Sequence, residues 1–334
     1  MKELIICALL LGSRRIAEGV NHMKDLGAKG LAKEKVEKDK AMFGGREIAG
    51  KTLAVIGLGH IGAATARDAN SLGMLVKGYD PGLNVHAAIR LPRQMKLSDS
   101  IIAAVTGADY ISLNIPYIKA SGGTHHIINH DVISHFKSDA VLLNFARGEL
   151  VDSDAMKEFL DQGHGRYVTD FPDDVLWNHK NAIVIPHLGA STEEAEDSAA
   201  SMAADTIKEY LEEGTIRNSV NFPTTSLSNR QPNTVRFTVV NKNLPGMLAH
   251  ITDTFSKAGL NISQQINQSR GPIAYNVIDV ELESQHTNVT LFKNLQEQLI
   301  KLEGVLSTRV LYGGPDSSVS SGFAKNLDGA FEYV

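Results

Sequence analysis

The chain has only one cysteine, Cys7, among its 334 residues. An internal disulfide is therefore excluded, and the composition fits a reducing compartment such as the cytoplasm. No group of Cys, His, Asp or Glu has the spacing of a metal site, so no bound metal is expected. Lys and Arg form no run long enough to neutralise successive phosphates, and the formal net charge is -5. Nucleic acid is therefore not an expected partner.

Long hydrophobic runs are also scarce. The run at residues 4–11 follows a lysine and imitates the basic and apolar regions of a signal peptide. It breaks at Gly12, lacks a small-residue cleavage site, and is too short to span a bilayer. Apolar residues then resume at helical spacing at Ile16, Val20 and Met23. We therefore expect buried helix in a soluble protein, with no membrane partner.

Hydrophobic residues make up 43% of the chain, enough for two globular cores. Between residues 51 and 187, short β-branched runs alternate with amphipathic stretches, which is typical of a parallel sheet covered by helices on both faces. The expected strands are 52–56, 75–79, 109–114, 140–145, 166–169 and 182–185, and the expected helices are 60–72, 97–105, 153–160 and about 191–211. This pattern predicts an α/β fold with a doubly wound Rossmann sheet.

A second unit follows a polar, proline-containing stretch. Its expected elements are strand 234–240, helix 246–258, strands 261–267 and 274–281, helix 289–302 and strand 307–312. This β-α-β-β-α-β order predicts a ferredoxin-like α+β domain. The predicted organisation is a Rossmann domain with flanking helices at 1–213, a linker at 214–232, the second domain at 233–312, and a flexible Gly- and Ser-rich tail at 313–334.

A glycine-rich segment, residues 57–62, directly follows the first expected strand and opens a helix. In that context Gly57 permits a tight turn, Gly59 lets the backbone approach a pyrophosphate, and Gly62 lets helix and strand pack closely. Asp80 ends the next strand, where a carboxylate accepts hydrogen bonds from a ribose diol and repels the 2'-phosphate of NADP. The pattern predicts NAD as cofactor; the alternative is a glycine-rich turn with a chance acidic residue.

Three segments, at residues 50–62, 143–151 and 186–192, resemble the signature sequences of the NAD-dependent D-2-hydroxyacid dehydrogenases, in the same order and closely spaced. The resemblance covers about residues 1–220, and with the C-terminal unit it narrows to the phosphoglycerate dehydrogenases of that family. It implies a homo-oligomer that oxidises D-3-phosphoglycerate to 3-phosphohydroxypyruvate, a step of serine biosynthesis, with hydride passing to NAD.

Arg147 and His187 each follow an expected strand, so they lie beyond the carboxyl ends of the sheet, where such folds bind ligands. Oxidation of a 2-hydroxy acid needs a group that takes the hydroxyl proton, and histidine suits that task near neutrality. A guanidinium can hold the substrate carboxylate or carbonyl oxygen in a fixed fork. We therefore expect His187 to be the base and Arg147 the clamp. The alternative for His187 is a buried polar or capping role, and the alternative for Arg147 is a surface ion pair.

The family also places a glutamate behind the histidine, but residues 167–176 contain none. Asp174 is the expected substitute, with Asp173 as the alternative; either side chain is one methylene shorter and could equally belong to a solvated turn. Asp170 matches the family position beside the nicotinamide, and Asn114 stands where a histidine is common. The cofactor cleft implied by the resemblance consists of Gly57, Gly59, His60, Ile61, Gly62, Asp80, Asn114, Pro116, Phe145, Ala146, Arg147, Asp170, His187 and Gly189.

Residues 241–251 and 258–262 resemble the ACT domain, a small-molecule sensing module that binds serine in phosphoglycerate dehydrogenases. Asn243 and Asn261 match asparagines that hold the amino acid there, and an amide suits a zwitterion because it offers both donor and acceptor. Asn241 replaces the family's usual histidine. Alternatively, Asn243 caps the helix at Gly246 and Asn261 occupies a left-handed turn.

The family builds its substrate lobe partly from residues before the Rossmann unit, and this chain begins at what resembles the long connecting helix. The resemblance thus implies that most of that lobe is absent, together with the loop amides that bind the substrate carboxylate. Three hypotheses follow: an active phosphoglycerate dehydrogenase, a pseudoenzyme that binds NAD and an amino acid without turnover, or a reductase of another 2-oxo acid.

Overall fold

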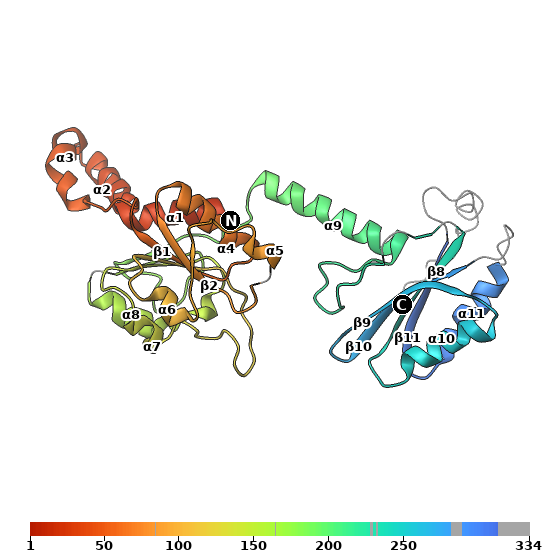
Figure 1. Cartoon of the computed structure of the whole chain (residues 1–334). Helices are drawn as coiled ribbons and strands as arrows, with labels where there is room; N and C mark the ends of the chain where they lie inside the picture. Colours follow the sequence, from red (N-terminus) through yellow and green to blue (C-terminus); the bar gives the residue numbers. More distant parts are fainter. Residues whose placement is uncertain (84, 164, 228–229, 232, 282–288, 313–334) are drawn as a thin grey trace. The chain divides into compact units, whose positions relative to one another are not determined.

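The computed structural model describes residues 1–334 except 84, 164, 228–229, 232, 282–288 and 313–334 (Figure 1). The tail expected at 313–334 lies outside the described residues. Internal contacts divide the chain into a first unit, Met1–Thr192, and a second unit that begins at Glu193. The long helix α9 (Glu193–Glu213) therefore groups with the second unit, whereas the sequence placed it at the end of the first.

The first unit is built on a seven-stranded parallel sheet in the order β3-β2-β1-β4-β5-β6-β7. Its strands are β1 (Thr52–Ile56), β2 (Leu75–Tyr79), β3 (Lys96–Leu97), β4 (Tyr110–Leu113), β5 (Val141–Asn144), β6 (Arg166–Thr169) and β7 (Ala182–Val184). This order confirms the doubly wound fold, and six strands agree with the sequence to within one residue at each end. The expected helix at 97–105 is corrected, because Leu97 belongs to edge strand β3 and the helix starts only after Ser100.

Helices cover both faces of this sheet (Figure 1). The helices of this unit are α1 (Lys2–Arg14), α2 (Ile16–Ala28), α3 (Ala32–Asp39), α4 (His60–Ser71), α5 (Val85–Ala88), α6 (Ile101–Val105), α7 (His130–Ser134) and α8 (Ser153–Asp161), with 3-10 turns η1 (Lys40–Phe43) and η2 (Gly148–Leu150). Of these, α2 and α3 extend away from the sheet (Figure 1). The apolar N-terminal run forms α1, as expected. Its Ile5, Ala8 and Leu9 are buried with the α4 face of the sheet.

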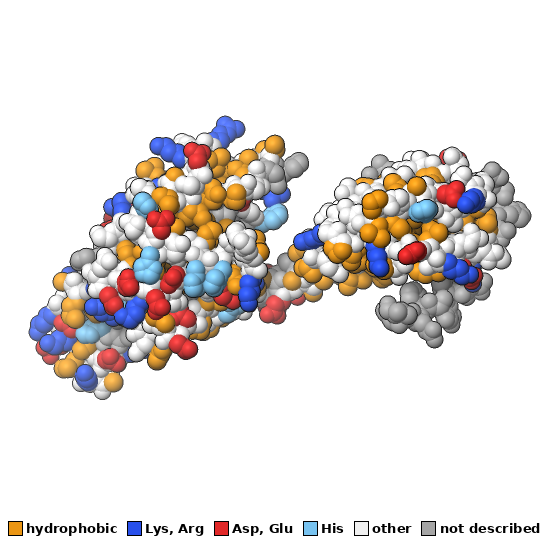
Figure 2. Space-filling model, turned by 90° about the horizontal axis from the view of Figure 1, so that it is seen from below, with side chains coloured by type: hydrophobic (Ala, Val, Ile, Leu, Met, Phe, Trp, Pro, Cys, Tyr) orange, Lys and Arg blue, Asp and Glu red, His pale blue; other side chains and the backbone are white. Residues whose placement is uncertain are grey.

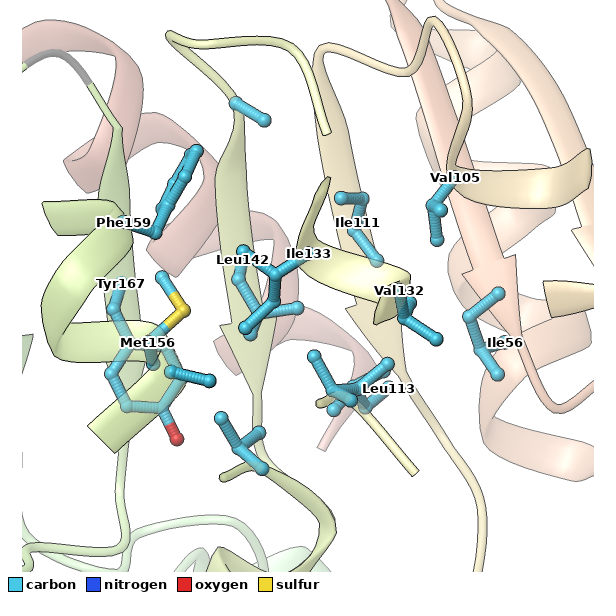
Figure 3. Close-up of a cluster of buried hydrophobic side chains, with 14 of the residues drawn as sticks. Ile56, Val105, Ile111, Leu113, Val132, Ile133, Leu142, Met156, Phe159 and Tyr167 are labelled. Carbon is cyan, nitrogen blue, oxygen red and sulfur yellow. The ribbon is translucent and has the colours of Figure 1, made fainter. Parts of the chain in front are cut away.

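Because parallel strands are buried on both sides, their residues feed two separate cores. Leu53 and Val55 of β1 point toward α1 and α4, whereas Ala54 and Ile56 point toward α6, α7 and α8. Figure 3 shows the second cluster, in which Phe159 and Met156 lie against Tyr167 and other side chains fill the space beside Ile56. These two cores hold the carboxyl ends of the strands in fixed positions.

The second unit has an antiparallel sheet in the order β11-β8-β10-β9. Its elements are α9, β8 (Thr234–Lys242), α10 (Met247–Lys257), β9 (Ile262–Arg270), β10 (Ile273–Glu281), α11 (Val289–Lys301) and β11 (Val305–Leu311). The β-α-β-β-α-β order is confirmed. Phe237, Phe255 and Phe292 lie in the apolar core between the sheet and its two helices.

The segment expected as a linker is packed against the opposite face of this sheet. Ile216 is buried with Tyr275 and Val277, and Phe222 packs beside them. The Tyr275 hydroxyl donates to the Gly214 carbonyl at 2.8 Å. A polar, proline-containing stretch therefore supplies a layer of the second unit here, because its few apolar residues meet an apolar sheet face.

Beneath that layer lies a buried ion pair between register partners of β8 and β10. Arg236 Nε lies 2.6 Å from Asp279 Oδ1, and Arg236 Nη2 lies 2.8 Å from Asp279 Oδ2. The remaining guanidinium nitrogen, Nη1, donates to the Glu213 carbonyl at 2.8 Å. Two charges without access to water are tolerated because their hydrogen bonds are satisfied in this way.

The surface of the first unit carries mixed charge. On the face in Figure 2, acidic, basic and histidine side chains are interspersed. No helix in the described part of the chain combines the length and the apolar character that crossing a membrane requires.

Candidate active site

The glycine-rich loop connects β1 to α4. Gly57 has φ +90°, and a Cβ there would overlap the Asn114 carbonyl. A Cβ on Gly62 would lie 3.0 Å from Gly57 C and closer still to its oxygen. At Gly59 a Cβ would meet nothing within 4 Å. The loop is thus closed at its two ends and open in the middle, where free backbone amides of the α4 N-terminus fit a pyrophosphate.

Asp80 lies beside this loop. Its Oδ2 accepts from the Leu58 amide and its Oδ1 from the Gly82 amide, both at 2.8 Å. A carboxylate has about four acceptor positions, so two amides leave room for ribose hydroxyls. These bonds show that Asp80 also fixes the glycine loop, a role that the sequence did not suggest.

Arg90 adds positive charge beside the first turn of α4. His60 opens the helix, and Arg90 Nη1 lies 2.8 Å from His60 Nδ1. Ile61 follows and is 43% exposed. Since a guanidinium can only donate, His60 Nδ1 is the acceptor in this pair and Nε2 carries the proton. The cationic group and the helix terminus therefore both favour an anionic ligand.

Arg147 follows β5 on a loop that is held by a buried amide. Asn144 is fully buried, and its Nδ2 donates to the Arg147 carbonyl at 2.9 Å and lies 3.1 Å from the Tyr167 hydroxyl. Its Oδ1 accepts from the Ala146 amide at 3.2 Å. The Arg147 side chain is exposed, with its guanidinium carbon 6.0 Å from the centre of the Phe171 ring. The clamp candidate is therefore anchored through its backbone and open at its tip.

His187 lies after β7 with a side chain that is 56% exposed. The edge of the Phe171 ring contacts it, with ring centres 4.8 Å apart. Its Nδ1 lies 3.7 Å from Oδ2 of Asp170, whose side chain is completely buried. Burial raises the pKa of Asp170, and the positive charges of His187 and Arg147 only partly offset that rise. The loops after three neighbouring strands thus bring together an imidazole, a guanidinium and a carboxylate.

The carboxylate beside His187 is not the expected one. Asp173 Oδ1 accepts from the amides of Val175 and Leu176, at 2.8 and 2.7 Å, and its Oδ2 accepts from Ser153 Oγ at 3.0 Å. Asp173 therefore caps a turn, and the next residue, Asp174, is exposed. The pairing expected between Asp174 and His187 is corrected, because within the described residues His187 forms its ion pair with Asp170.

The other expected cofactor residues line the same edge of the sheet. Asn114 Nδ2 lies 3.1 Å from Ser112 Oγ, while its buried Oδ1 has no hydrogen-bond partner in the described part of the chain. The Pro116 carbonyl accepts from Thr124 Oγ1 at 2.7 Å, and Phe145 is buried. Gly189 packs against Met1, whose side chain would collide with a Cβ at that position.

Several residues at the site were not predicted, among them Asn144, Met1, Phe171 and Arg90. Asn144 acts within the strand end itself, and a polar residue after the apolar run Val141–Leu143 was its available signal. Met1 reaches the site from the start of α1, and no local sequence pattern indicates that contact. Among the described residues, no three His, Cys, Asp or Glu side chains are grouped so as to hold a metal ion.

The three expected effector residues do not meet within one chain. Asn241 is buried and accepts from Asn276 at 2.7 Å. The backbone N–H of Asn243 donates to the Pro272 carbonyl, just before β10. The backbone carbonyl of Asn261 accepts from the Glu281 N–H, at the far end of β10. Nine residues of strand separate those ends by about 27 Å. The alternative roles are corrected too, because α10 has no side-chain cap and Asn261 does not have a positive φ.

Comparison with known proteins adds family evidence. Residues 7–189 match the family "D-isomer specific 2-hydroxyacid dehydrogenase, NAD binding domain". D-3-phosphoglycerate dehydrogenase of Haemophilus influenzae is 32% identical over 82% of this chain and 66% of its own length. The enzyme of the same name from Dictyostelium discoideum is 31% identical over 93% of this chain and 72% of its own length. The chain thus spans about two thirds of the length of these relatives.

Among solved structures, apo D-mandelate dehydrogenase of Rhodotorula graminis is similar with a TM-score of 0.58 and 22% identity. The match covers 68% of this chain and 66% of the other. At this identity the likeness supports the fold alone. It agrees with the doubly wound sheet.

Proposed function

The chain belongs to the D-isomer specific 2-hydroxyacid dehydrogenases, and from that membership we propose that it oxidises D-3-phosphoglycerate to 3-phosphohydroxypyruvate with NAD. The observation that carries the proposal is the grouping of Arg147 and His187 beyond the strand ends of a sheet whose centre holds the glycine loop. The choice of substrate is supported by relatives that are themselves named D-3-phosphoglycerate dehydrogenase.

The binding residues follow from the geometry of the loop. The α4 amides beyond Gly59 receive the pyrophosphate, with His60 Nε2–H as a further donor. Asp80 accepts from the ribose hydroxyls while its bonds to Leu58 and Gly82 keep it in place. NAD, when bound, supplies the hydride acceptor.

The chemical step then falls to two side chains. Arg147 holds the substrate carboxylate or carbonyl oxygen and stabilises negative charge that develops there. His187 takes the hydroxyl proton through Nε2, because Nδ1 faces Asp170. In the reverse direction the same nitrogen returns the proton to the carbonyl oxygen.

The second unit supports an ACT-like regulatory role with serine as the effector. Asn243 and Asn261 lie at opposite ends of β10, so a site that uses both needs a second copy of the chain. This geometry favours a homo-oligomer in which each copy supplies one of the two amides. Asn241 contributes indirectly, since its side chain already bonds to Asn276 and to the Lys242 carbonyl.

The test is NADH formation by the purified chain with D-3-phosphoglycerate at alkaline pH, beside calorimetric NAD binding. We expect turnover in the wild type, and NAD binding without turnover in His187→Ala. Wild-type NAD binding without turnover would contradict the catalytic proposal and support the pseudoenzyme. Faster reduction of an unphosphorylated 2-oxo acid would instead replace the proposed substrate.

A further inference from the structure

We propose that Asp170 orients the imidazole of His187 and stabilises its protonated form. This buried aspartate would then have the role that a separate glutamate has in the family that the sequence resembles. Asp170 then acts as a positioning residue for the base. The inference rests on the dehydrogenase function proposed above.

The environment of Asp170 supplies the first argument. Its side chain has no exposure, and neither carboxylate oxygen has a hydrogen-bond partner among the described residues. An ionised carboxylate buried without hydrogen bonds is costly and requires a positive neighbour. The cations that act on it are His187 and Arg147, and Oδ2 lies 3.7 Å from His187 Nδ1. A pair at this distance shortens readily to a hydrogen bond when substrate is bound.

The second argument comes from the competing carboxylates. Asp173 has both oxygens bonded within its turn and to Ser153. Asp174 is exposed and makes no ion pair with His187 in the part of the chain that the structure describes. Neither therefore replaces Asp170, which directly follows β6, the strand that pairs with β7 and so lies beside the residues that lead to His187.

The arrangement has a chemical consequence for proton transfer. With Nδ1–H directed at Asp170, the Nε2 lone pair is free to accept the proton as the substrate O–H bond breaks. The electron pair of the broken O–H bond then forms the second bond of the carbonyl, while hydride leaves the same carbon for NAD. The resulting imidazolium is repelled by Arg147, attracted by Asp170, and flanked by the uncharged ring of Phe171.

The experiment follows the protonation of His187 by NMR, which needs no turnover. Imidazole resonances are titrated in the wild type, Asp170→Asn and the matched control Asp174→Asn, with His187→Gln used to assign the signal. We expect the titration midpoint of His187 to be lower in Asp170→Asn than in the wild type, because an opposite charge within a few ångströms is lost. Asp174→Asn should leave it unchanged.

An unchanged midpoint in Asp170→Asn, or a lower one in Asp174→Asn, overturns the proposal. A measurement on the wild type guards against misfolding of the variant: the Asp170 carboxyl carbon must show an inflection at the His187 midpoint, and its absence also overturns the proposal. These readouts stand even if the chain does not turn over. If it does, the acidic limb of oxidation should move to lower pH in Asp170→Asn.

Discussion

Adding one methyl group to the glycine loop should separate folding from cofactor binding. In Gly62→Ala the new Cβ would lie 3.0 Å from Gly57 C, 3.3 Å from Val55 Cγ1 and closer still to the Gly57 oxygen. The loop cannot retreat, because Gly57 is itself pressed against Asn114. Overpacking of this kind costs about 3 kcal/mol. In a unit of this size, that lowers Tm by roughly 6–12 °C.

Gly59→Ala is the matched control for stability. Gly59 has φ -66°, and its Cβ would meet nothing within 4 Å. The free energy of unfolding should change by less than about 0.5 kcal/mol. NAD affinity should nevertheless fall, since the methyl group stands where a pyrophosphate approaches the backbone.

The only tryptophan in the sequence is Trp177, which lies in the first unit. Its fluorescence therefore reports the thermal unfolding of the first unit in both full-length variants, and calorimetry gives NAD affinity. A Gly62→Ala protein that melts with the wild type would refute the packing argument. A Gly59→Ala protein with unaltered NAD affinity would refute the assigned binding position.

Three further changes test other parts of the molecule. Arg147→Lys should lower kcat/KM about 100-fold, because an ammonium cannot reproduce the guanidinium fork; equal activity would exclude the clamp. Asp279→Asn should destabilise the second unit by about 3–5 kcal/mol in urea denaturation, because Arg236 stays buried without its counter-charge; a small loss would show that the charge reaches water.

Burial alone would raise the pKa of Asp109, but hydrogen bonds from Lys137 and a backbone amide outweigh it and lower that pKa. The stability it contributes is present above the unfolded pKa near 4 and is lost as pH falls through the folded value. In Asp109→Asn, the free energy of unfolding should therefore fall less steeply at acid pH than in the wild type. The same pH dependence in the two proteins, measured by urea denaturation at a series of pH values, would contradict this.

Most of the sheet was predictable because buried parallel strands appear as short β-branched runs. The strand Lys96–Leu97 and the helix His130–Ser134 were missed, since each is too short to show a period. The covering role of residues 214–227 was also missed, because it depends on which apolar surface the segment meets.

The site was predictable where a residue follows a strand. Gly57, Asp80, Arg147 and His187 could be located by that rule, because the carboxyl ends of parallel strands share one edge. The partner of His187 could not, since spacing along the chain does not reveal that Asp173 is used to cap a turn.

The layer formed by residues 214–227 also decides where the second unit can be separated from the rest of the chain. A cut at Thr234, the first residue of β8, removes the carbonyls that receive the Tyr275 hydroxyl and the third nitrogen of Arg236. It would also uncover the apolar face around Val277. An excised fragment that starts at Glu193 keeps these partners, whereas the shorter one should aggregate.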